Sequence, residues 1–210
     1  MTRNVFLHFT VGILIQMLVA AVSGGCSPVP APEQRERYAV ERGIVTFHIS
    51  GAHTGSATYY FEDWGNREAM YLDYAATAAA PGARSLFAVI SDDEGGHYLV
   101  DLAGGTAARV AAAAGMPLPG DLGGAWLGGA GEGLLESIGA RGEVRKVLLF
   151  QCTEWRVAGG SSCIWDRLPL ITVLGKAPRS TTIAASGVRL GAEPPAQKLA
   201  LPAGIAVGGG

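Results

Sequence analysis

From Gly43 onward, apolar and polar residues alternate in short runs, and each run is bounded by Gly, Asn or Asp. A period of two is typical of half-buried β-strands, and the even spacing of the runs favours an antiparallel meander. Within one run Tyr59 and Phe61 share a face, while Tyr60 points to the other. The pattern therefore predicts a mainly β fold with strands at residues 43–50, 56–61, 67–74, 85–91, 97–102, 144–157, 163–173 and 181–190.

The middle of the chain breaks this alternation and contributes the minor α content. We predict short helices at Ala107–Ala114, in an alanine run, and at Glu132–Ile138. The span between them includes Gly123–Gly133, whose glycines predict a mobile loop.

The stretch Gln151–Leu170 predicts a β-hairpin that turns at Ala158–Ser161. It holds two of the three cysteines and two of the four tryptophans of the chain. We expect this hairpin to finish and lock the sheet.

The first 25 residues predict a lipoprotein signal peptide. Arg3 supplies a basic start, Val5–Val22 carries no charge, and small residues precede Cys26. We expect Cys26 to be lipidated, which would anchor the protein in the cell envelope facing the periplasm. Ser27, which is not Asp, favours the outer membrane. The alternative is an uncleaved membrane-spanning anchor, because about 18 apolar residues can just cross a bilayer.

Residues 26–42 predict a proline-rich tether. It contains three prolines and a charged run from Glu33 to Arg37, which we expect to be solvated. The roughly 180 residues after the signal peptide are enough for one domain with a real core. We place this single curved-sheet domain at residues 43–202 and a flexible Pro, Ala and Gly tail at residues 203–210.

With Cys26 assigned to the lipid, Cys152 and Cys163 remain as a pair in an oxidising compartment, and we expect a disulfide between them. A turn centred on Gly159–Gly160 would instead place Cys152 opposite Arg167. A disulfide therefore needs a bulge or a longer, asymmetric loop on the Trp155 side. Without it, the hairpin would carry two buried thiols.

The residues indicate no catalytic, metal or cofactor site, and we expect no enzyme activity. His48, His53 and His97 lack metal-ligand spacing. The glycine-rich loop lacks the Gly-Lys-Ser/Thr ending of a phosphate-binding loop, and the acids from Asp92 to Glu94 read as a solvated turn. A formal net charge of −2 with interspersed acids and bases gives no electrostatic footprint for nucleic acid.

Two parts of the chain resemble a family of uncharacterised exported bacterial proteins whose domain is related in shape to the lipoprotein carriers LolA and LolB. The first is Gly55–Arg67 with the run YFEDWGNREA; the second is CTEW at Cys152–Trp155 with IWDRLPL at Ile164–Leu170 and Leu201–Pro202 near the end. The resemblance implies an incomplete, strongly curved antiparallel barrel with short helices on its open side.

The aromatic side chains on the predicted strands are compatible with two different functions. In the first, a curved sheet binds a lipid or acyl chain in a groove lined by Phe61, Phe87 and Trp155, and the loop around Trp126 moves as a lid. In the second, these side chains form a packed core, and the protein is a structural or interaction lipoprotein that docks other envelope proteins. A cavity lined by Phe and Trp would favour the first, and a filled core with an exposed apolar patch the second.

Overall fold

The computed structural model describes residues 37–78, 83–91, 96–111 and 115–208. The signal peptide, Cys26 and most of the tether lie outside these ranges, and so do Asp92, Asp93 and Glu94. The fold described below belongs to the unit that begins at Gln34.

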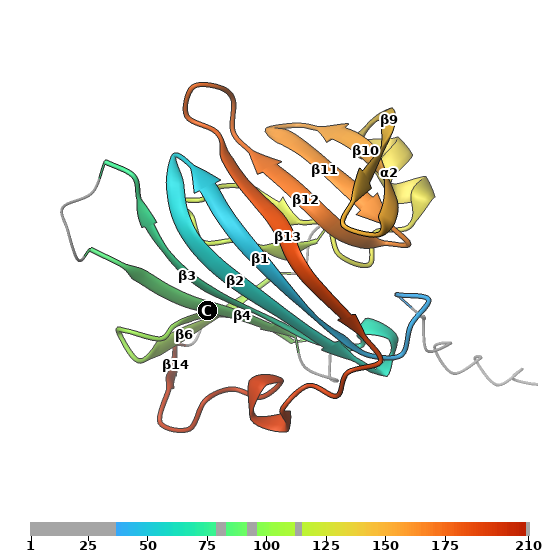
Figure 1. Ribbon diagram of the computed structural model, residues 1–210. Coiled ribbons are helices and arrows are strands. Elements are labelled where there is room, and N and C mark those ends of the chain that lie inside the picture. The colour runs from blue at the N-terminus through green and yellow to red at the C-terminus, as the bar shows by residue number, and fades with distance from the viewer. Residues whose placement is uncertain (1–36, 79–82, 92–95, 112–114, 209–210) are drawn as a thin grey trace, which may run out of the picture. The chain divides into compact units, whose positions relative to one another are not determined.

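One large sheet makes up most of this unit (Figure 1). Its order is β14-β6-β5-β4-β3-β2-β1-β13-β12-β11-β10-β9, and it does not close, because β14 and β9 form its two edges. All neighbours are antiparallel except β14 and β6. The strands are β1 (Gly43–Gly51), β2 (His53–Glu62), β3 (Arg67–Ala76), β4 (Ser85–Ser91), β5 (His97–Asp101), β6 (Thr106–Val110), β9 (Gly139–Val147), β10 (Phe150–Val157), β11 (Gly160–Trp165), β12 (Leu168–Leu174), β13 (Thr181–Leu190) and β14 (Ala206–Gly208).

The mainly β, curved and unclosed antiparallel sheet confirms the predicted fold class. Alternation along the strands divides the sheet into two faces. We call inner the face with Phe47, Tyr59 and Phe61, which belong to one buried cluster, and outer the face with Tyr60, which packs against another. The helix α2 (Glu132–Ile138) has the predicted bounds. Two 3₁₀ turns, η1 (Asp63–Gly65) and η2 (Ala196–Lys198), and a small ribbon of β7 (Met116–Pro117) and β8 (Ala125–Trp126) complete the described elements.

The predicted helix at Ala107–Ala114 is wrong over its described part, which lies in β6 and just after it. Gly105, with a φ of +68°, ends the turn that brings the chain back along β5. The ladders to β5 on one side and β14 on the other give the backbone hydrogen-bond partners that a helix would otherwise supply. Residues 112–114 lie outside the described part of the chain.

Two of the predicted strands are in fact hairpins. Residues 144–157 belong to β9 and β10, which turn at Leu148–Leu149, and residues 163–173 belong to β11 and β12, which turn at Asp166–Arg167. Asp166 and Arg167 both have positive φ, 47° and 66°, as a type I′ turn requires. Neither turn contains glycine, so the sequence pattern shows no break there.

The tail after residue 202 is not free. Ala206–Gly208 form β14, and before them Leu199, which is 2% exposed, packs against Ile90 and Val100 on the outer face. The ammonium group of Lys198 lies 4.3 Å from the ring centroid of Tyr71. The chain beyond β13 thus covers part of the outer face before it joins the edge of the sheet (Figure 1).

Candidate functional site

The inner face of the sheet is filled by a segment that we call the plug (residues 115–131). Its Trp126 is 0% exposed, with its ring centroid 5.1 Å from that of Phe47 and 5.6 Å from that of Tyr59. The chain is close-packed here, since a Cβ on Gly115 would lie 2.3 Å from the Trp126 carbonyl oxygen. In Figure 1 the yellow strands of the plug pass behind β1 and β2.

Phe61, Phe87 and Trp155, predicted to line a groove, and Trp126, predicted on its lid, do not line a common groove within the described part of the chain. Phe61, which is 0% exposed, packs against Tyr38, and half-buried Phe87 stacks on Tyr74. Both belong with Trp126 to the inner-face cluster. Trp155 lies in a separate cluster beside α2, formed with Leu127, Ala130, Leu135 and Ile164.

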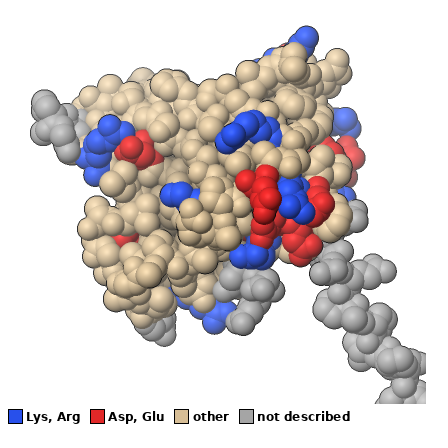
Figure 2. All heavy atoms as spheres, turned by 60° about the horizontal axis from the view of Figure 1, so that its bottom comes forward, with Lys and Arg blue, Asp and Glu red and all other residues tan. Residues whose placement is uncertain are grey.

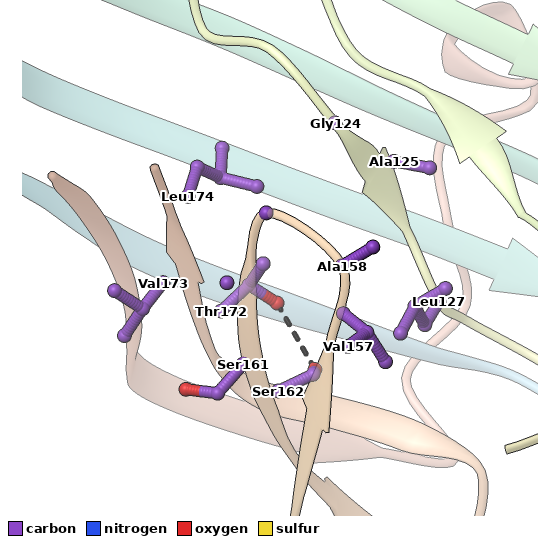
Figure 3. Close-up of a pocket in the computed structure, with 12 residues that line it drawn as sticks. Gly124, Ala125, Leu127, Val157, Ala158, Ser161, Ser162, Thr172, Val173 and Leu174 are labelled. Carbon is purple, nitrogen blue, oxygen red and sulfur yellow. Dashed lines mark hydrogen bonds between the residues drawn. The ribbon is translucent and has the colours of Figure 1, made fainter. Parts of the chain in front are cut away.

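A small pocket lies between the plug and the β10–β11 turn (Figure 3). Leu127 of the plug lies beside Val157, and the Ser162 hydroxyl lies 3.2 Å from that of Thr172. The pocket volume is about 30 Å³, which holds one or two water molecules. Sites for drug-sized ligands are roughly 300–1,000 Å³, so this pocket does not accommodate an acyl chain.

Next to the plug, a buried carboxylate gathers polar groups from distant parts of the chain. Glu68 is 1% exposed, and its Oε1 lies 2.6 Å from Arg37 Nη1. Tyr59 and Tyr38 donate hydrogen bonds to Oε2, and Arg37 Nη2 donates to the Gly128 carbonyl at 2.9 Å. This Arg37–Glu68 network therefore ties the segment before β1 to β2, β3 and the plug.

The protonation states suit these roles. Burial, followed by the nearby Glu68 carboxylate, raises the pKa of Tyr38 and of Tyr59 well above the ordinary value, so both phenols remain donors. Burial alone would lower the pKa of Arg37, but the charge of Glu68 raises it above the ordinary value, so the guanidinium stays charged.

Arg37 is a correction to the predicted tether, in which it belonged to a solvated charge run. Tyr38 is likewise in the core, at 2% exposure. A sequence signal for Glu68 did exist: alternation in β3 places it on the same face as Met70, Leu72 and Tyr74, all of which are buried. A carboxylate at such a position needs a charged or hydrogen-bonding partner.

Ser91 and His97 form a serine–histidine hydrogen bond, a contact that catalytic pairs also make. Ser91 Oγ lies 2.6 Å from His97 Nδ1 and 3.5 Å from Glu68 Oε1. The serine is only 2% exposed, so its hydroxyl extends the network instead of facing a substrate. Within the described ranges, no three His, Cys, Asp or Glu residues are grouped so that they could hold a metal ion.

Cys152 and Cys163 are joined in a disulfide, with their Cα atoms 5.3 Å apart. The predicted register, with Cys152 opposite Arg167, is wrong. The turn is Ala158–Gly159, and Glu154 pairs with Cys163, so the two cysteines are diagonal neighbours on the inner face. Bulges lie close to both, between Thr153 and Trp155 on β10 and after Cys163 on β11.

Charges of both signs lie close together on the face that Figure 2 shows, and most of that face is uncharged. The exposed ion pairs include Arg42 with Glu41 and Arg84 with Asp73. Among the residues that the structure describes, no helix is long and apolar enough to cross a membrane.

Comparison with known proteins finds matches among solved structures, nine chains in all. No family model and no curated protein matches the chain. Among solved structures, the crystal structure of MucB is similar at 16% identity with a TM-score of 0.39, over 80% of this chain. This chain spans 59% of the MucB chain. At this level of similarity we draw no functional argument from it.

Proposed function

We propose that this protein is a lipid-anchored, non-enzymatic component of the cell envelope that acts by docking to other envelope components. The observation that carries the docking role is the filled inner face: Trp126 is fully buried where a ligand would lie, and the adjoining pocket holds about 30 Å³. Several large apolar side chains are exposed on the surface instead, and Leu149 and Val144 are the most exposed of those in the described residues.

The anchor is proposed from the sequence. Cys26 follows small residues at the end of an uncharged apolar run, and a polar, proline-bearing segment follows it. The outer membrane is the proposed location, on the identity of Ser27. This arrangement would hold the folded domain at the membrane while leaving its surface open to partners.

We expect Cys26→Ala to release the protein into the soluble periplasm or to leave the precursor uncleaved, because the acceptor thiol is lost. Membrane fractionation and intact-mass measurement check this. A variant that still yields a membrane-bound mature form of unchanged mass would refute the lipid anchor. Cys152→Ala with Cys163→Ala is the matched control, since neither thiol precedes the domain.

A second candidate is the acyl-chain carrier, with the plug opening to admit the ligand. One observation favours it: among the described residues, none accepts a hydrogen bond from the buried Trp126 Nε1. Leaving such a donor unpaired costs about 1–3 kcal/mol, which lowers the cost of moving the plug.

Mass spectrometry of organic extracts separates the two candidates. From the docking role we expect no stoichiometric non-covalent lipid on the purified protein and no shift in tryptophan fluorescence with micromolar acyl probes. Phe61→Asp is the control for any probe signal, because it would abolish uptake into the inner face. A co-purifying lipid at one per chain would replace the docking role with the carrier.

A further inference from the structure

The turn between β9 and β10 breaks two local rules at the same place. Leu148 has a φ of 54°, a backbone conformation that favours glycine, asparagine or aspartate. Leu149 beside it is 86% exposed, and Leu148 is 45% exposed. Strain and apolar exposure together, in a turn that normally selects polar residues, make this turn a candidate for a functional role.

Aromatic and then charged residues lie behind these two leucines along the strands. We call Val147–Phe150 the β9–β10 tip. At its base, the Phe150 and Trp165 rings lie 4.5 Å apart, and both are half-buried. On β9, exposed Lys146 pairs with Gln151 in the ladder. Arg145, the residue before it, forms an ion pair with Glu154, which lies farther from the tip. At about 3.3 Å per residue, Lys146 lies roughly 7 Å behind Leu148.

This sequence of layers matches the boundary of a lipid bilayer. When a protein segment enters a bilayer by about 5–10 Å, its apolar side chains lie deepest, aromatic rings lie at the level of the headgroups, and a cation behind them lies at the depth of the phosphates. Pairing with a strand from another protein fits less well, because edge strand β9 carries exposed Arg141, Glu143 and Lys146, charges that discourage strand addition.

The tip lies at the same end of the strands as the start of β1. In a meander, successive turns lie at opposite ends of the strands, so the β9–β10 tip and the Asp166–Arg167 turn, which are separated by one turn, lie at the same end. β12 pairs with β13, whose last residue Leu190 pairs with Gly43, the first residue of β1. The described part of β1 therefore begins at the end of the strands where the tip lies.

We propose that the β9–β10 tip inserts into the interface of an anionic bilayer, with Leu148 and Leu149 below the headgroups and Lys146 at the phosphates. This contact would orient the domain on the membrane. This proposal rests on the proposed function only in that the lipid anchor would bring the domain to a membrane. Insertion of the tip into a bilayer does not depend on the anchor.

A depth-sensitive label tests the proposal. The full chain carrying Leu149→Cys, labelled with an environment-sensitive fluorophore, is reconstituted into vesicles of 70% phosphatidylcholine and 30% phosphatidylglycerol. The control is Lys176→Cys, in the β12–β13 loop at the opposite end of the strands. We expect a blue shift and at least about threefold stronger quenching by shallow nitroxide lipids at position 149 than at 176. Equal quenching at the two positions would overturn the proposal.

Charge reversal gives the second measurement. One cation near an anionic surface changes partitioning by about fivefold, so Lys146→Glu should lower the ratio of inserted to free tip by about 25-fold at low salt. Lys176→Glu should leave that ratio unchanged. An unchanged ratio of inserted to free tip in Lys146→Glu would contradict the bilayer contact. So would a blue shift that appears only when another envelope protein is added.

The outcomes separate this proposal from the anchor. In the soluble form of the Cys26→Ala chain, which lacks both the acyl group and the extra thiol, the label at position 149 can be titrated with added vesicles, where the tip should still insert. An acylated protein whose label stays in water would end the tip proposal and leave the anchor intact.

Discussion

Arg37→Ala is expected to lower the free energy of unfolding by about 3 kcal/mol, one of the two largest effects that we predict for a single substitution. Breaking a buried ion pair from one side costs roughly 3–5 kcal/mol, because the remaining charge stays buried without its counter-charge. The lower end applies here, since the Arg37 side chain is 27% exposed while Glu68 is 1% exposed. The variant also loses the hydrogen bond from Arg37 to the Gly128 carbonyl, which holds the plug.

Denaturant unfolding of the full chain measures this effect, and Arg42→Ala is the matched control. Arg42 pairs with Glu41 at the surface, with side chains 35% and 48% exposed, and such solvent-screened pairs contribute little to stability. Adding Glu68→Gln to Arg37→Ala should recover part of the loss, because no buried charge then remains. If Arg37→Ala and Arg42→Ala are equally mild, Arg37 is not part of the core.

Trp126→Ala is expected to destabilise the protein by about 3–5 kcal/mol, the range for a large core aromatic reduced to alanine. The ring is completely buried and lies between Phe47 and Tyr59, so its removal leaves a cavity on the inner face. Trp126→Phe should cost less than about 1.5 kcal/mol, because it keeps most of the packing and the indole N–H has no acceptor among the described residues.

The pair of Trp126 variants also bears on the function. An apolar cavity that stays dry can bind small apolar molecules, so Trp126→Ala should take up an apolar probe that the unaltered protein and Trp126→Phe exclude. Calorimetry or probe fluorescence measures the uptake. If Trp126→Ala is as stable as the unaltered protein, the plug does not fill the inner face, and the carrier becomes the better proposal.

The disulfide adds a local restraint to the same face. Cys152 and Cys163 are both buried in the inner-face cluster, and they connect β10 and β11 close to two bulges. The sequence indicated the pairing from compartment and cysteine count, but the register that it suggested was off. The turn contains Ala158 and Gly159 instead of Gly159 and Gly160, and this shift makes the cysteines diagonal neighbours.

Much of the sheet could be predicted because alternation is a local property. In β2, Tyr59 and Phe61 share one face while Tyr60 points to the other, as predicted, and the fold makes the first of these the inner face. The bounds of α2 were predictable for the same reason. The alanine run that became β6 shows the limit, since alanine has high helix propensity and the ladders to β5 and β14 override it.

The functional surfaces depended on partners that are remote in sequence. Arg37 reads as a solvated charge until the fold places it against Glu68, 31 positions away, and Trp126 reads as part of a loose loop until β1 and β2 surround it. The two leucines of the β9–β10 tip read as strand interior, and only the turn exposes them. Local sequence specifies which residues alternate, whereas burial and pairing of charges depend on which distant segments meet, because the free energy of desolvation is determined by the assembled surroundings.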